Sequence, residues 1–333
     1  MTALLLISIA SFAQEPSTVK PATNQQSQQR RGPRPYTLTF INNSSFNLDT
    51  VAKEDFKKIF DKVYPAYAQA DGYRTKRDVT MEISDKYSGT LSAKAGEIVV
   101  NSDWLAKNRK SFEKLLMNQF SKNWISADTL KKGAYQLVFI SKAPDFDPVV
   151  KQNLINTYFK VYPKLVKKFN KKTTKEVLFV VDTAYKGVAE ASGNRILFSA
   201  NYMKSHPTDI DIVTHEGMHL VQGYGYSAGP VWLTEGIADY IRYKYGVDNI
   251  GSKWALPDFN EKQNYKNSYR ITARFFEWLE QNVKKGLIMT LDKELRAHTY
   301  TEQSWAKLTG KTIDELWADY AKSPSVKLKY SGK

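Results

Sequence analysis

The stretch His215-Glu-Gly-Met-His219 decides which fold this sequence is expected to adopt. On an α-helix, residues four positions apart lie on the same face about one turn apart, so both histidines can direct a ring nitrogen at one cation. Glu216 projects beside that pair, where its carboxylate can reach a metal-bound water rather than the metal. The spacing predicts an active-site helix over residues 208–222 that supplies two zinc ligands, His215 and His219, and a general base, Glu216.

A second helix with two acidic residues follows closely. In Gly229-Pro-Val-Trp-Leu-Thr-Glu-Gly-Ile-Ala-Asp-Tyr240 a proline precedes the first turn, and Glu235 and Asp239 share one helix face. In such an arrangement one carboxylate becomes the third zinc ligand and the next accepts the outward N–H of a ligating histidine. We predict Glu235 as the ligand and Asp239 as the hydrogen-bond partner. Asp239 as the ligand, with Glu235 in support, is the alternative. Gly236 is expected to let the two helices approach closely.

Part of the chain repeats at an offset of 98 residues. Val63-Tyr-Pro65 recurs as Val161-Tyr-Pro163, and the hydrophobic pattern around both copies is that of strand, helix, strand, strand and helix. The ranges are 36–41, 53–70, 79–84, 97–101 and 111–123 in the first copy, and 136–141, 149–169, 177–182, 196–200 and 208–222 in the second. We therefore predict an internal duplication.

The strand at 196–200 is expected to pair with an extended peptide substrate.

Only the second copy carries the metal-binding chemistry. At the shifted positions of His215, Glu216 and His219 the first copy has other residues, Met117, Asn118 and Ser121. Methionine is a poor zinc ligand, and a neutral amide cannot act as a base. The first copy is therefore expected to be a degenerate, non-catalytic domain.

The composition limits the classes of protein that this chain can represent. With 333 residues, 42% of them hydrophobic and 13% aromatic, it is long and apolar enough to be globular. The absence of cysteine excludes disulfides, thiol nucleophiles and cysteine-based zinc sites. The formal net charge of +15 favours contact with anionic cell-surface polymers. The lysines are dispersed, so no nucleic-acid partner is expected.

The first 35 residues read as a targeting segment and a tether. An apolar stretch too short to span a membrane ends at the small residue Ala13, as in a signal peptide. Residues 14–35 are polar and rich in proline, as in a flexible linker. No later run is apolar enough for a membrane span. We expect a secreted or periplasmic protein.

Four blocks of sequence together resemble the basic secretory protein family, zinc peptidases of plants and bacteria. They are His215-Glu-Gly-Met-His-Leu-Val-Gln222, Glu235-Gly-Ile-Ala-Asp-Tyr240, Ser268-Tyr-Arg-Ile-Thr-Ala-Arg-Phe275 and Trp305-Ala-Lys-Leu-Thr-Gly-Lys311. The resemblance extends from about Gln136 to Ser323. It implies a zincin-like catalytic domain, with a helix on a sheet and a glutamate as third zinc ligand. Tyr269, in the third block, is expected to be a partly buried, packed aromatic. A hydrogen bond from Tyr269 to the oxyanion, as tyrosines make in related zincins, is the alternative.

These observations give one expected organisation. The fold class is α+β, with a zincin-like catalytic domain, built on a mixed sheet with an active-site helix, preceded by a degenerate duplicated α+β copy. The ranges are 1–13 for the signal peptide, 14–35 for the linker, 36–130 for the degenerate repeat domain and 135–325 for the zinc metallopeptidase domain.

The expected function is zinc-dependent hydrolysis of peptide bonds, with one Zn²⁺ per chain and protein or peptide substrates. With three protein ligands bound, a fourth zinc position stays open for a water whose pKa falls to about 7. Glu216 then takes the proton of this water and delivers it to the leaving amine. A non-catalytic glycan- or cell-wall-binding protein with a vestigial or structural metal site is the alternative. The presence of Glu216 argues against it, because a structural site needs no general base.

Overall fold

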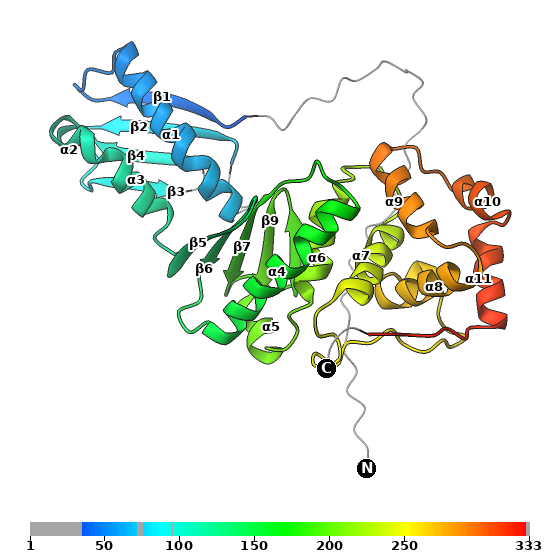
Figure 1. Cartoon of the computed structure of the whole chain (residues 1–333). Helices are drawn as coiled ribbons and strands as arrows, with labels where there is room; N and C mark the ends of the chain where they lie inside the picture. Colours follow the sequence, from blue (N-terminus) through cyan, green and yellow to red (C-terminus); the bar gives the residue numbers. More distant parts are fainter. Residues whose placement is uncertain (1–34, 72–75, 95, 331–333) are drawn as a thin grey trace, which may run out of the picture. The chain divides into compact units, whose positions relative to one another are not determined.

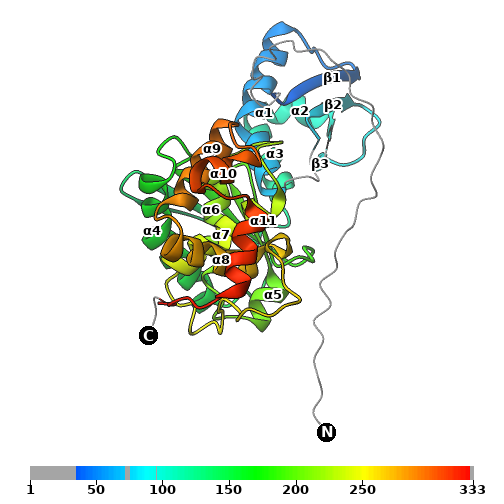
Figure 2. The same cartoon turned by 90° about the vertical axis from the view of Figure 1, so that its right-hand side faces the viewer.

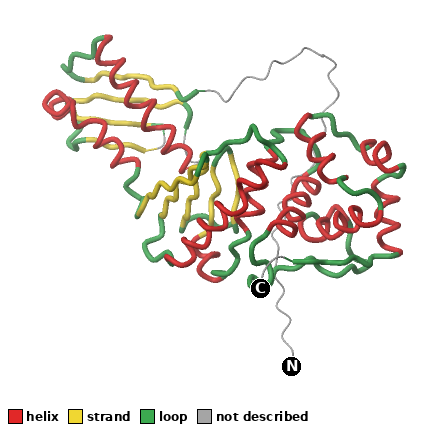
Figure 3. Tube along the Cα trace, viewed as in Figure 1, coloured by secondary structure: helices red, strands yellow, loops and turns green. Residues whose placement is uncertain are grey.

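The strands in the described part of the chain form two sheets, a first one of four strands and a second one of five (Figure 3). The computed structural model describes residues 35–71, 76–94 and 96–330. The predicted signal peptide at 1–13 and the predicted linker at 14–35 therefore lie, apart from Pro35, outside the described residues. No helix in the described ranges is long and apolar enough to cross a membrane.

The sheet that leads to the predicted metal-binding helix has five strands in the order β5-β6-β7-β9-β8 (Figure 1). They are β5 (Ser126–Lys132), β6 (Tyr135–Ser141), β7 (Glu176–Asp182), β8 (Ala189–Ser192) and β9 (Arg195–Ser199). The three inner strands run parallel, and the two outer strands pair antiparallel. β7 is buried on both faces after its first residue, which explains why it is a continuous apolar run.

One face of this sheet packs against two helices, α4 (Pro148–Lys168) and α6 (Ile212–Gln222). Alternate residues of the strands, such as Phe179 and Phe198, enter this core. Gly217 lies at the contact of α6 with α4, where an added Cβ would meet the Tyr162 ring at 3.4 Å, an ordinary van der Waals distance. This packing fixes the position of α6, the helix that carries His215, Glu216 and His219.

Six more α-helices follow β9 in the described part of the chain, besides α6 (Figures 1 and 2). They are α5 (Ala200–Ser205), α7 (Val231–Tyr245), α8 (Tyr269–Asn282), α9 (Leu287–Ala297), α10 (Gln303–Thr309) and α11 (Ile313–Lys322). Gly236 on α7 faces α8, where a Cβ would overlap the side chain of Thr272. The expectation that Gly236 serves the approach of α7 to α6 is therefore wrong: it serves the approach of α7 to α8.

The first sheet has four strands in the order β1-β2-β4-β3. Its elements are β1 (Thr37–Asn43), α1 (Thr50–Asp71), β2 (Asp78–Ser84), β3 (Leu91–Lys94), β4 (Glu97–Asn101), α2 (Ser102–Asn108) and α3 (Phe112–Phe120). One apolar core joins these strands to α1 and α3. The bounds of β2, β3 and β4 coincide with those of β7, β8 and β9 after a shift of 98 residues. Mixed α+β architecture is thus common to both parts of the chain.

Specific contacts also recur between the two parts. The Tyr64 hydroxyl donates to the carbonyl of Lys76 at 2.7 Å, and the Tyr162 hydroxyl donates to the carbonyl of Thr174 at 2.9 Å. The first strand departs from the shift, since Leu38 pairs with Val79 whereas Leu137 pairs with Val177. β1 and β6 therefore correspond at an offset of 99. These recurrences support the duplication, which remains our proposal.

Two expectations about the strands are corrected by the pairing. β5 bonds to β6 in the second sheet, so a first domain that ends at residue 130 would cut through this strand. The strand predicted at 196–200 to bind substrate is β9, which is paired on both sides, to β7 and β8. Its backbone groups are already used within the sheet, so it cannot pair with a peptide.

Candidate metal centre

Three side chains from two helices converge on one point. His215 and His219 come from α6 and Glu235 comes from α7. The two imidazole Nε2 atoms lie 3.1 Å apart, and each lies 3.3 Å from Oε2 of Glu235. The three candidate ligand atoms therefore form a nearly equilateral triangle.

This triangle fits a tetrahedral zinc ion. Ligands at about 2.0–2.1 Å from such an ion are separated from one another by about 3.3 Å, which is the separation found here. Two imidazole nitrogens and one carboxylate oxygen are also a ligand set that zinc binds in catalytic sites. The residues present can thus hold zinc and leave one position open.

Asp239 orients the first histidine. Its Oδ1 lies 2.6 Å from Nδ1 of His215, in a buried position on α7 one turn after Glu235. Burial alone would lower the pKa of His215, but the charge of Asp239 and the hydrogen bond to it raise this pKa well above its ordinary value. The bond assigns a proton to Nδ1, so Nε2, which faces the cluster, is the nitrogen on which a metal ion can replace a proton.

Gln222 orients the second histidine, and the sequence analysis missed this role. Its Oε1 lies 2.7 Å from Nδ1 of His219, and its Nε2 donates to the carbonyl of Thr234 at 2.9 Å. Because the amide NH₂ faces a carbonyl, the oxygen must face the histidine, which then carries its proton on Nδ1. The sequence could have indicated this contact, because Gln222 lies three residues after His219 and therefore on the same helix face.

Glu235 is held as a carboxylate. Burial disfavours its charge, but the hydrogen bonds and charges of His215 and His219 outweigh this effect and hold its pKa well below the usual value. A carboxylate that stays ionised is the form that binds a cation. Of the two acidic residues on α7, Glu235 faces both Nε2 atoms, whereas Asp239 faces the outward nitrogen of His215.

Glu216 is buried beside the cluster. Burial raises its pKa, and the charges of the two histidines oppose this rise. Glu190, on the edge strand β8, adds to the rise and is itself paired with Arg195 at 2.9 Å. A carboxylate with a raised pKa is a stronger base than an ordinary glutamate.

The ends of α6 are held by contacts outside the cluster. The side chain of Asp211, the residue before the first turn of α6, makes no capping hydrogen bond to this helix. The side chain of Asp211 instead accepts the backbone N–H groups of Val247 and Asp248, both at 2.6 Å. At the other end Gly223 adopts φ 52°, in the left-handed region that glycine tolerates, and this ends the helix. The helix is thus tied at its start to the segment that follows α7.

Tyr269 lies at the cluster, contrary to the expectation of a packed aromatic. Its ring is 6.2 Å from that of His215, nearly parallel at 19°, and 52% of the residue is exposed. Burial of the hydroxyl and the nearby carboxylates raise its pKa to about 12, so the phenol keeps its proton at neutral pH. Ser268 and Tyr269 have φ values of 65° and 52°, which cost free energy in residues other than glycine. Such strain is typical of functional sites.

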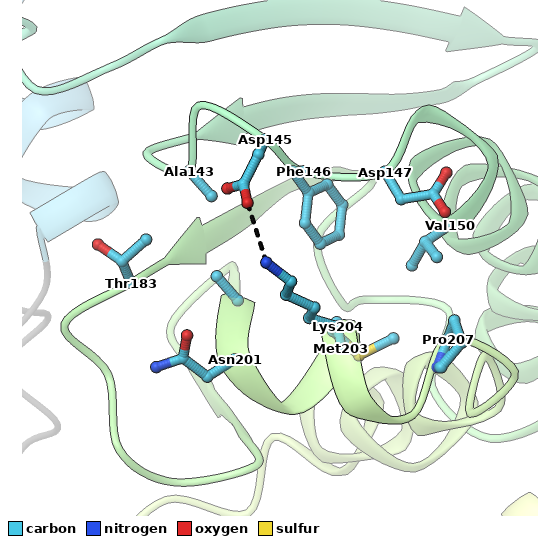
Figure 4. Close-up of a pocket in the computed structure, with 11 residues that line it drawn as sticks. Ala143, Asp145, Phe146, Asp147, Val150, Thr183, Asn201, Met203, Lys204 and Pro207 are labelled. Carbon is cyan, nitrogen blue, oxygen red and sulfur yellow. Dashed lines mark hydrogen bonds and ion pairs between the residues drawn. The ribbon is translucent and has the colours of Figure 1, made fainter.

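A separate cavity of about 280 Å³ lies at the carboxyl ends of β6 and β9 (Figure 4). It is lined by apolar side chains such as Phe146 and Met203, and Lys204 reaches Asp145 beside it at 3.1 Å. Both charged side chains are largely exposed, so their ion pair contributes little stability. None of the residues lining this cavity belongs to the metal-binding cluster.

Comparison with known families gives the class of this protein. The sequence matches the BSP family, described as a peptidase of plants and bacteria, over residues 133–320. Because this match covers more than half of the chain, the protein belongs to that family. The predicted membership of the basic secretory protein family is thus confirmed. No curated protein sequence matches the chain.

Several solved structures are distantly similar. An aminopeptidase N family protein from Idiomarina loihiensis has a TM-score of 0.39 and 10% identity, over 62% of this chain and 47% of its own. A two-domain M1 zinc metallopeptidase bound to L-tryptophan has a TM-score of 0.36 and 11% identity, over 61% and 52%. Aminopeptidase A of Legionella pneumophila, in complex with aspartic acid, has a TM-score of 0.35 and 13% identity, over 58% and 27%. This chain spans about half or less of the length of these proteins.

Proposed function

We propose that this protein is a zinc-dependent peptidase in which His215, His219 and Glu235 hold the metal and Glu216 is the general base. The convergence of two Nε2 atoms and one carboxylate oxygen at 3.1 to 3.3 Å carries the proposal. A buried glutamate beside them and membership of a peptidase family support it. A structural or vestigial metal site would explain the triangle but not the buried carboxylate.

When bound, zinc would supply a coordinated water with a pKa of about 7 and would polarise the scissile carbonyl. Glu216 accepts a proton from the attacking water and passes it to the departing amine nitrogen as the C–N bond breaks. Asp239 and Gln222 hold the two histidines in the tautomer that leaves each Nε2 free to bind. The protonated phenol of Tyr269 donates a hydrogen bond to the oxyanion that forms on the substrate carbonyl.

The edge strand β8 is the proposed place for the substrate backbone. It contacts α6, and among the described strands only β9 pairs with it. On this strand the carbonyl of Ala189 already accepts the hydroxyl of Tyr185 at 3.2 Å, so the proposed pairing uses the residues after Ala189. An extended peptide can add to such an edge by main-chain hydrogen bonds. This role replaces the one first expected for the strand at 196–200.

The proposal places the active enzyme outside the cytoplasm, secreted or periplasmic, with protein or peptide substrates. The sequence of the first 13 residues and the family support this location. Anionic polymers of the cell surface are a second proposed contact, because the formal net charge is +15.

Cleavage of a mixed peptide library by wild-type protein and by Glu216→Gln tests the proposal. Glutamine keeps the shape of the side chain but cannot accept the proton, so we expect intact zinc binding and loss of most hydrolysis. Glu261→Gln, a matched change at an exposed loop position, should cleave like wild type. Cleavage by Glu216→Gln at the wild-type rate would show that Glu216 is not the base. Binding of glycan by a protein that cleaves no peptide would favour the non-catalytic alternative.

A further inference from the structure

The outer edge of β1 has no partner strand in the described part of the chain. β1 is the first strand of the order β1-β2-β4-β3 and pairs on one side only, with β2 (Figure 1). The N–H of Thr37 donates to the carbonyl of Arg77 at 2.9 Å, so the odd-numbered residues of the strand direct their backbone groups at β2. The N–H and C=O groups that face away from the sheet are those of Leu38, Phe40 and Asn42.

The second sheet shows how the same edge is covered. β6 matches β1 at the offset of 99 residues, with Leu137 and Phe139 in place of Leu38 and Phe40. There the outer edge is occupied by the antiparallel strand β5, which pairs with β6 along its whole length. No described strand stands in the place of β5 beside β1. The geometry of the edge therefore suits an antiparallel strand from elsewhere.

β1 also lacks the usual protection of an exposed edge. Thr37-Leu-Thr-Phe-Ile-Asn-Asn43 contains no charged residue and no proline, and its pairing with β2 is continuous. Edge strands commonly carry lysine, proline or a bulge that prevents pairing with other chains. β5, in contrast, carries Asp128, Lys131 and Lys132. The formal net charge of +15 opposes association of two copies, and an uncharged edge strand is a place where they can meet without like charges directly opposite each other.

We propose that β1 pairs antiparallel with β1 of a second copy of this chain, so that the two sheets become continuous across a two-fold axis. The strand is complementary to itself. With Phe40 on the axis, Leu38 of one copy lies opposite Asn42 of the other, and these outward-facing residues exchange the backbone hydrogen bonds.

Between these residues Thr39 lies opposite Ile41, twice by symmetry. Both side chains point to the exposed face of the sheet, where Ile41 is 43% exposed. Pairs of β-branched residues stabilise antiparallel strands, and this pair would cover Ile41. A partner strand with a charged residue opposite Thr39 or Ile41 would not form this β-branched pair. The proposal concerns an interface in the first part of the chain and does not depend on the metal chemistry.

Sedimentation equilibrium of the full-length protein tests the proposal. We expect the average mass of wild type to rise from monomer to dimer with concentration, and Thr39→Lys to raise the dimer dissociation constant about tenfold or more, because it removes the Thr39–Ile41 pair twice and adds two like charges. Thr39 is exposed, so the monomer should tolerate the change. Ser88→Lys adds the same charge at another exposed position and should dimerise like wild type. A monomer at all concentrations, or equal dimerisation of Thr39→Lys, would overturn the proposal.

Amide hydrogen exchange in the same samples identifies what covers the edge. In dilute protein the amides of Thr39 and Ile41 should be protected by β2, whereas those of Leu38, Phe40 and Asn42 should exchange fast. In concentrated protein the second group should become protected too. Protection of Phe40 in monomeric protein would mean that another part of the same chain occupies the edge, and this result would also overturn the proposal.

Discussion

Gln222 lies with its Oε1 2.7 Å from Nδ1 of His219 while its amide nitrogen donates to Thr234 on the next helix. One glutamine therefore fixes the tautomer of a candidate ligand and ties α6 to α7. Asp239 serves His215 in the same way at 2.6 Å. Each histidine of the candidate centre thus has a partner for its outward nitrogen.

Gln222→Leu should weaken zinc binding about 10- to 100-fold, the scale for loss of a group that orients a ligand. Leucine is similar in size but leaves Nδ1 of His219 without an acceptor. Competition with a chelator of known affinity measures the change. Gln152→Leu is the control, because Gln152 is exposed and its side-chain amide donates to Asn156 at 2.9 Å, on α4. If Gln222→Leu binds zinc with the same affinity as wild type, Gln222 does not orient His219 for metal binding.

Alanine substitution of the two acidic residues of α7 should reduce zinc binding to different extents. Glu235→Ala removes a ligand and should abolish stoichiometric zinc, as should His215→Ala and His219→Ala. Asp239→Ala should keep a measurable affinity, lower by about 10- to 100-fold. Elemental analysis of the dialysed variants gives the answer. If Asp239→Ala loses zinc outright and Glu235→Ala keeps it, Asp239 is the ligand.

Tyr269→Phe should lower kcat by about 100-fold, the scale for loss of one oxyanion donor, with little change in zinc content. The hydroxyl is the only group removed, and its pKa of about 12 keeps it a donor at neutral pH. Tyr226→Phe is the matched control, since Tyr226 is 98% exposed in the loop between α6 and α7. An unchanged kcat in Tyr269→Phe would assign the tyrosine to packing alone.

The predictable parts of the fold were those with strong hydrophobic periodicity. The apolar run of β7 and the long amphipathic pattern of α4 were placed within one or two residues of their bounds. β5 was missed, because Ser-Ala-Asp-Thr-Leu-Lys-Lys is polar on both faces and is a strand only through its pairing with β6. The position of β9 inside the sheet was also beyond the sequence, because it depends on the short polar strand β8.

The candidate site also has a part that helix spacing predicts and a part that depends on tertiary packing. Spacing alone predicted that His215 and His219 share a face, and the structure brings Glu235 to both of them. The contact of Gln222 with His219 lies within α6, three residues apart, and could have been read from helix spacing. The contact of Tyr269 depends on how α8 packs against α6, which no local pattern records. The metal role of all these residues remains a prediction.

Titration of zinc into the metal-free protein, with peptide cleavage as the readout, tests the central claim most directly. The account predicts that cleavage is lost when zinc is removed and returns in proportion to added zinc, with a break at one equivalent per chain. Cleavage that persists in the metal-free protein, or zinc that binds at one equivalent without restoring cleavage, would contradict it.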